Sequence, residues 1–259
     1  MATGRTENKY YRAYVDGYDL SGYGRTIGPL EITYDEADLT AHMSDAVKGY
    51  LPGHPQVNVG TLNAVFDNTA TTGLHALASS AGVARTVLVA IGIRAAPVDG
   101  DPCFGGSFIQ DGYQAAEDGG AATVNITYSG WNVDAGSLLY ASQWGVLLHA
   151  LAARTSAQGA NAGTGFDNPT GGQTIKGGYF LYQVTAGNGT ATLSVDDSAN
   201  NSTWVALSVA TSGSITCAAG VSGIVALGNA ATVRHYLRWQ VVFGTATSVT
   251  WAAAFMRNF

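Results

Sequence analysis

Charge, proline, cysteine and long apolar runs are all scarce in this chain of 259 residues. Charged side chains make up only 12% of it, and it contains 6 Pro and 2 Cys. The formal net charge is −6 and no cluster of Lys or Arg occurs, so the sequence does not predict electrostatic binding to DNA or RNA. Small neutral residues take the place of charged ones, which favours a β-rich protein whose surfaces are covered by other copies of itself.

Several classes of protein are disfavoured by these shortages. The 13 Tyr, 8 Phe and 5 Trp supply a core, so wholesale disorder is excluded. Cys103 and Cys217 stand alone in the two halves, and two free buried thiols are expected. No apolar run approaches the ~20 residues that span a bilayer, and no signal-peptide pattern opens the chain. We therefore expect synthesis in a reducing cytoplasm and no membrane partner.

Sequence motifs for catalysis and cofactor binding are missing as well. No G-x-S-x-G, H-E-x-x-H, P-loop or C-x-x-C occurs, and the five His stand singly. The acidic run Tyr34 to Asp38 and the turn Asp99 to Asp101 lack the further ligands of a calcium loop. The second half offers only Asp167 and the adjacent pair Asp196 and Asp197 as carboxylates, and neighbours on a strand point to opposite faces. We expect no enzyme, no cofactor and no metal site.

What the sequence does contain is strand alternation with one clear helix. Strands are predicted at 11–15, 30–34, 56–66, 86–93, 103–113 and 122–128. Leu74, Leu77, Ala78 and Ala81 have helical spacing between Thr71 or Thr72 as cap and Gly82 as stop. Between Glu36 and Pro55 the alternation stops, and a loop with a short helix is expected. Residues 137–152 fit either strand or helix.

A Gly/Asn/Thr-rich stretch from Arg154 to Gln173 reads as a linker between two separate cores. Seven short strands follow, at 178–185, 190–196, 204–209, 214–217, 223–227, 232–242 and 248–256, which predicts a sandwich or jelly roll. Alternation over 233–241 places Trp239 on an apolar, packed face. Trp204 follows a polar turn, and it is the predicted glycan contact if the second half binds sugar.

The first half resembles the major tail tube protein of long-tailed bacteriophages. The resemblance covers about residues 10–155 and rests on the order YRAYVDGYDLSGYGRTIGPLEITYDEADLT, a long loop to GYLPGHP, then QVNVGTLNAVFDN, TTGLHALASS and RTVLVAIGI. The second half is similar to the immunoglobulin-like or carbohydrate-binding-like sandwiches that follow phage structural domains. The implied architecture is mainly β: a tail-tube-type sandwich or barrel domain with one packed α-helix (1–155), a linker (156–173) and a β-sandwich domain (174–259).

The resemblance also implies a function and partners. Tail tube subunits join their sheets into rings, commonly hexamers, that stack into a DNA conduit in the virion tail. Expected partners are the chain itself, the tape measure protein and tail-end proteins, with DNA only in transit. An inter-subunit arm is expected on the 39–52 loop, through Leu39, Met43, Val47, Tyr50 and Leu51. An acidic wall of the channel is expected at Asp35, Glu36 and Asp38.

Two other classes stay open. One is a different virion protein, a capsid decoration or tail completion or adhesion protein with a carbohydrate-binding second domain. The other is a polysaccharide-active enzyme, which is the least favoured because it needs a close pair of carboxylates in a cleft.

Overall fold

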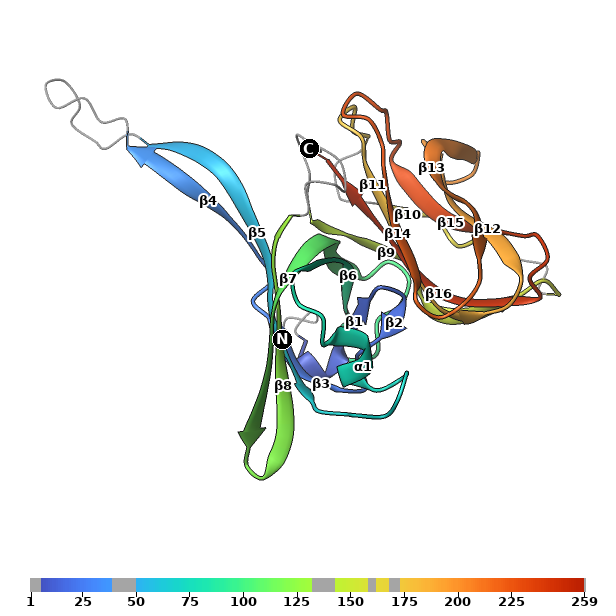
Figure 1. Ribbon diagram of the computed structural model, residues 1–259. Coiled ribbons are helices and arrows are strands. Elements are labelled where there is room, and N and C mark those ends of the chain that lie inside the picture. Colours follow the sequence, from blue (N-terminus) through green and yellow to red (C-terminus); the bar gives the residue numbers. More distant parts are fainter. Residues whose placement is uncertain (1–5, 39–49, 132–142, 158–161, 168–172, 259) are drawn as a thin grey trace, which may run out of the picture.

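The protein is mainly β, as predicted, with a single short α-helix among the residues that the computed structural model describes (Figure 1). Those residues are 6–38, 50–131, 143–157, 162–167 and 173–258. The first half contains η1 (Asn8–Tyr10), β1 (Tyr11–Val15), β2 (Tyr18–Asp19), β3 (Gly24–Gly28), β4 (Glu31–Asp38), β5 (Tyr50–Val65), α1 (Leu74–Ala78), β6 (Val83–Ile91), β7 (Pro102–Asp118) and β8 (Ala121–Trp131). The second half contains β9 (Trp144–Thr155), β10 (Phe166–Asp167), β11 (Gly178–Gly187), β12 (Thr190–Ser198), β13 (Val205–Thr216), β14 (Val221–Ala226), β15 (Tyr236–Phe243) and β16 (Ser248–Arg257).

One long antiparallel sheet runs through both halves of the chain. Its order is β14-β11-β16-β9-β7-β6-β1-β2, and it branches at β7 through β8 to β5, which also pairs with β3 and β4. A second sheet, β10-β15-β12-β13, belongs to the second half alone. The second half is therefore a sandwich of this small sheet against one end of the long sheet.

Three apolar clusters form the core. One fills the first half, where Leu74 and Ala78 of α1 pack against strands of the sheet. A second fills the sandwich of the second half and includes Trp239, which confirms the packed face predicted for β15. The third lies between the two halves. It combines side chains from β1, β6 and β7 with side chains from β9, β11 and β16.

Each half has a core cluster of its own, but the two halves do not pack separately, because the third cluster joins them. In the third cluster Leu88 and Cys103 lie with Tyr179 and Leu181, and all four side chains are fully buried. The Tyr179 hydroxyl donates to the Gly105 carbonyl at 2.8 Å, a hydrogen bond from the second half to the first. The halves share a core because the long sheet curls back on itself. The predicted boundaries at 155 and 173 remain a prediction.

The stretch expected to be a linker is paired where it is described. Phe166 and Asp167 form β10 on β15, and Ala162 bridges to Gln240. Short apolar and glycine-containing segments of this kind can add an edge strand without a strong periodic signal. The expected linker is therefore, in these parts, an edge of the small sheet.

The ambiguous segment 137–152 is strand from Trp144 onward. Val146 and Leu148 face the sandwich core, whereas Leu147 faces the cluster between the halves. A strand buried on both faces carries an unbroken apolar run, which is why periodicity did not separate strand from helix. Residues 137–142 lie outside the described residues.

Two other local expectations need correction. The predicted helix is real but spans only Leu74–Ala78, with Gly73 and not a threonine at its N-cap. The predicted loop with a short helix between Glu36 and Pro55 is strand at both of its ends, because β4 and β5 continue to pair out to Asp38 and Tyr50. Cys103 and Cys217 are free and buried, as expected.

Candidate assembly interface

A long hairpin formed by β4 and β5 projects from the body of the molecule (Figure 1). The outer part of β5 pairs with β4 from Glu31↔Asn58 to Asp38↔Tyr50. The inner part pairs with β8 and β3 inside the body. Within the described residues β4 pairs with β5 alone, so no second strand joins its other edge. Such an edge is a template for another strand.

Gly60 is the point at which the hairpin leaves the body. The register between β5 and β8 shifts between Asn58 and Gly60, and Gly60 has φ +70°. A Cβ there would lie 2.5 Å from the carbonyl carbon of Gly28. Only glycine combines this backbone conformation with so close an approach, so the direction of the hairpin is set at one residue.

The three carboxylates expected to form an acidic wall lie on this hairpin. Asp35, Glu36 and Asp38 are exposed on β4. Gln56 donates to Asp35 Oδ1 at 3.4 Å across the hairpin. Carboxylates on an open edge oppose pairing between identical strands, since like charges would meet. A partner for this edge therefore has to be a different surface, neutral or basic. The channel-wall role remains a prediction.

Of the five predicted arm residues, the structure describes Tyr50 and Leu51, which belong to the same hairpin. Leu39, Met43 and Val47 lie outside the described residues. Tyr50 and Leu51 open β5, where their backbones pair with Asp38 and Ala37. The role of these five residues in contacts between subunits stays a prediction.

A second hairpin, formed by β7 and β8, projects in the opposite direction (Figure 1). Its turn contains Gly119 and Gly120, both with positive φ, as tight hairpin turns require. Arg25 binds Asp118 near the tip at 2.6 Å, and both side chains are largely exposed. The molecule therefore extends a β-ribbon on each side of its first half.

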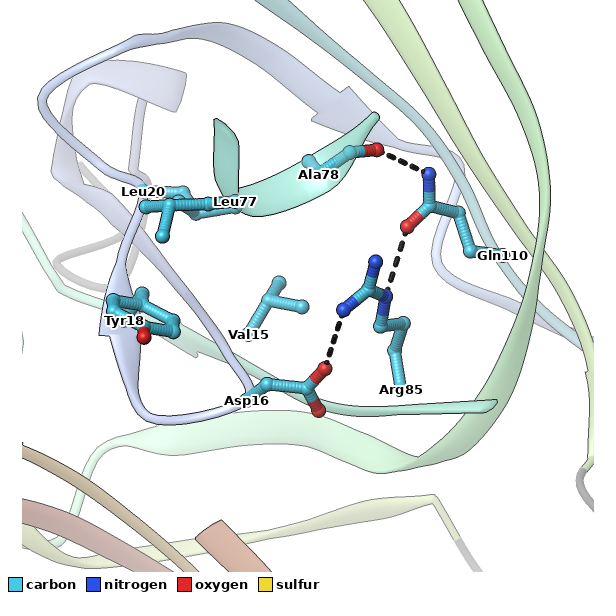
Figure 2. Close-up of a pocket in the computed structure, with 8 residues that line it drawn as sticks. All are labelled: Val15, Asp16, Tyr18, Leu20, Leu77, Ala78, Arg85 and Gln110. Carbon is cyan, nitrogen blue, oxygen red and sulfur yellow. Dashed lines mark hydrogen bonds and ion pairs between the residues drawn. The ribbon is translucent and has the colours of Figure 1, made fainter. Parts of the chain in front are cut away.

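The polar cluster in Figure 2 is structural. Arg85 donates to Asp16 Oδ2 at 3.0 Å and to Gln110 Oε1 at 2.9 Å, and Gln110 donates to the Ala78 carbonyl at 2.6 Å (Figure 2). The cavity beside them holds about 10 Å³, no more than one water. This chain of bonds ties the end of α1 to the sheet. Sequence reasoning missed it because its members are far apart in the chain.

Trp204, the predicted glycan contact, is partly buried. The guanidinium of Arg238 lies 4.6 Å from the centre of its ring. Arg238 in turn donates twice to Asp196 Oδ2, at 3.0 and 2.8 Å. One face of the indole is therefore occupied by a cation that is itself paired. The glycan role of Trp204 is untested by these contacts.

Asp196 and Asp197 are both buried, although they are neighbours on β12. Asp196 pairs with Arg238, and Asp197 pairs with Arg234 at 3.4 Å and accepts the Arg234 backbone N–H at 2.9 Å. They point to opposite sides of the small sheet, as alternation predicts. Asp167, the remaining carboxylate, lies 2.7 Å from His235.

A buried histidine marks the junction between the halves. His149 stacks on Trp239 with ring centres 4.5 Å apart and meets Trp251 edge-on. Its Nδ1 lies 3.6 Å from Asp99 Oδ1, too far for a hydrogen bond. Burial lowers the pKa of His149, and the Arg154 charge adds to this, while the Asp99 carboxylate opposes it. The neutral imidazole is the form that fits this site.

The described residues contain neither a group of His, Cys, Asp and Glu placed to hold a metal ion nor a helix long and apolar enough to cross a membrane.

Comparison with known proteins adds little to this geometry. No family model matches the chain, and no curated protein does. Among the solved structures that are similar to this chain is the Dit protein (gp 19.1) of SPP1, described as a paradigm of the hub adsorption apparatus in phages that infect Gram-positive hosts. It is 12% identical, with a TM-score of 0.30 over 96% of this chain and 99% of that one. A score this low establishes neither a common fold nor a common function.

Proposed function

We propose that this chain is a virion structural protein of a long-tailed bacteriophage, and that it is the major tail tube subunit, assembling into stacked rings around a DNA channel. The observation that carries the proposal is the projecting β4–β5 hairpin with an open edge on β4. An eight-residue edge of this kind is a liability in a monomer and is removed when a neighbouring subunit covers it. The resemblance of residues 10–155 to major tail tube proteins, which assemble in this way, supports the proposal.

The acidic composition suits such a role. A channel must let DNA pass without retaining it, and exposed carboxylates repel phosphate. Asp35, Glu36 and Asp38 are the residues we propose for the wall. The partners would be further copies of the chain, the tape measure protein and tail-end proteins, and DNA would pass without specific binding. The role requires no catalysis and no cofactor.

Assembly is tested with the arm variant Leu39→Ser, Met43→Ser, Leu51→Ser. Mass photometry and negative-stain microscopy of the concentrated wild-type chain should show rings or tubes, and this triple variant should stay monomeric with an unchanged melting curve. A matched control replaces three exposed apolar residues away from the hairpin, Val98, Ile175 and Val242, with Ser. The control should still assemble.

Two results would contradict the proposal. A wild-type chain that is monomeric by both methods at high concentration would remove the assembly role. A control variant that loses assembly as completely as the arm variant would show that general surface hydrophobicity, and not the arm, drives association.

A second candidate function is a different virion protein, for decoration, tail completion or adhesion, with a carbohydrate-binding second half. A groove in the second half, lined by Asp197 and Arg234 among others, favours it.

A further inference from the structure

A groove of about 320 Å³ lies at one end of the sandwich in the second half. It is found where β12 ends and where β13 and β15 begin, so three chain segments contribute to its walls. The volume is at the lower end of the range for small-molecule sites in proteins. The residues used below are Asp197, Val205, Thr232 and Arg234.

A carboxylate and a guanidinium form the polar part of the groove. The Asp197 side chain is 6% exposed, whereas that of Arg234 is 41% exposed. Asp197 accepts the Arg234 backbone N–H at 2.9 Å and a guanidinium N–H at 3.4 Å. A carboxylate has about four acceptor positions and a guanidinium five N–H donors, so this pair keeps the capacity to accept from and donate to a ligand.

The segment of the groove wall that carries Arg234 is anchored by hydrogen bonds to other parts of the second half. Arg257, itself buried, donates to the Arg234 carbonyl at 2.6 Å and to the His235 carbonyl at 3.3 Å. Val233 and Thr174 exchange two backbone hydrogen bonds, of 3.0 and 2.9 Å. A wall fixed in this way loses little freedom on binding, which is the property of a preorganised site.

The chemistry of the groove selects a class of ligand. An anion would meet the Asp197 carboxylate and a cation would meet Arg234, so neither sign of charge is favoured. Neighbouring hydroxyl groups of a ligand both donate and accept, and they match an adjacent carboxylate and guanidinium; Thr232 also lines the groove. Val205, which is 48% exposed, offers apolar surface for the C–H face of a sugar ring. We propose that this groove binds a neutral saccharide, with Asp197 and Arg234 as the polar anchors.

This site differs from the glycan contact expected from sequence. Trp204 is not among the residues that line the groove, and its ring packs against Arg238. The proposal deepens the second candidate function, carbohydrate binding by the second half, and it does not depend on the assembly role, because it needs no ring. Loss of assembly in the arm variant would leave it intact.

The test is saturation-transfer NMR and calorimetry on the full chain with defined sugars. The neutral probes are N-acetylglucosamine, glucose and galactose, and the charged probes are glucuronate and glucosamine. We expect saturable binding of at least one neutral sugar at millimolar concentration and weaker binding of the charged ones. Arg234→Gln should raise the Kd at least tenfold, since a hydrogen bond to a charged donor is lost.

Val205→Trp provides a second variant, because Val205 is an exposed residue of the groove directly opposite Asp197, and a larger side chain there would fill part of the groove. It should abolish binding while the melting curve stays unchanged. Arg25→Gln, a comparably exposed arginine in the first half, is the matched control and should bind as the wild type does. A disaccharide of the sugar that binds most tightly distinguishes two kinds of natural ligand. Tighter binding of the disaccharide indicates a polysaccharide, and equal binding indicates a single sugar unit.

Three results would overturn the proposal. One is the absence of saturable binding by every neutral probe. The second is binding that neither Arg234→Gln nor Val205→Trp reduces. The third is a charged sugar that binds more tightly than its neutral counterpart.

Discussion

Single residues in this protein are constrained most strongly where polar groups enter the core. Asp196 and Arg238 satisfy each other beneath the Trp204 ring, and Arg257 caps three successive carbonyls of one loop. Removing one partner of such a buried pair leaves the other uncompensated, which is far more costly than losing an exposed pair. His149 differs from these residues because its site suits only the uncharged ring.

The protonation of His149 predicts how stability depends on pH. Burial lowers its pKa in the native state, whereas in the unfolded chain it titrates near 6.5. Between these two values the unfolded state binds more protons, so stability should fall as pH is lowered below about 6.5. Urea melts between pH 7.5 and 5 should show this slope. His149→Phe keeps the stacking and should flatten it.

The matched control is His75→Phe on α1, which should leave the slope in place. Asp99 does not contribute to the slope over this pH range. Although burial raises the pKa of Asp99, the neighbouring His149 and the hydrogen bond from the Ala150 backbone N–H at 2.6 Å lower that pKa overall, so the contribution of Asp99 is lost only at more acid pH. An unchanged slope in His149→Phe would show that another group is responsible.

Among the elements, β5 belongs to two parts of the molecule: one end lies in the body and the other end forms the projecting hairpin. Gly60 joins the two parts with φ +70°. Glycine positions differ in what they demand: Gly82 has φ +79°, but a Cβ added there would meet nothing within 4 Å. Comparing substitutions at Gly60 and Gly82 therefore separates the cost of a positive φ from the cost of a steric clash.

Gly60→Ala should destabilise the protein by about 3 kcal/mol or more, since it adds a clash with the Gly28 backbone to the cost of a positive φ. Gly82→Ala should cost only about 1 kcal/mol, because strain acts there alone. Chemical denaturation of both variants measures the difference. Equal losses at the two positions would mean that the backbone near Gly28 moves away easily.

The whole molecule is one sheet-connected unit. β9, which precedes the expected linker, pairs with β16 along the register from Val146↔Phe255 to Thr155↔Ser248. It also supplies Val146 and Leu148 to the core of the sandwich. The sandwich of the second half is therefore incomplete without it.

A fragment of residues 143–259 should fold with a cooperative melt, whereas residues 170–259 should not. The shorter fragment lacks β9 and exposes the edge of β16 together with its core contacts. Residues 1–142 should be less stable than the same residues in the full chain, because the cluster between the halves is opened. Circular dichroism melts and hydrogen exchange measure this. A cooperative melt of 170–259 equal to that of 143–259 would contradict it.

Much of this architecture was determined by the sequence itself. Alternation located most strands of both halves, although β2, β3 and β10 were missed, β5 was predicted too short, and β13 was predicted as two strands, 204–209 and 214–217. Over 237–241 it assigned the buried face correctly, because each residue's side follows from local strand geometry. The position of α1 also followed from local spacing, although its length did not.

What the sequence left undecided is which strands meet. Alternation assigns a side chain to a face but carries no information on the neighbouring strand, and contacts such as Tyr179 with Gly105 join residues far apart in the chain. The shared core, the open edge of β4, the Arg85 cluster and the groove at Asp197 all arise from such long-range pairing. Only the tertiary structure decided them, since each depends on where the curled sheet brings distant segments together.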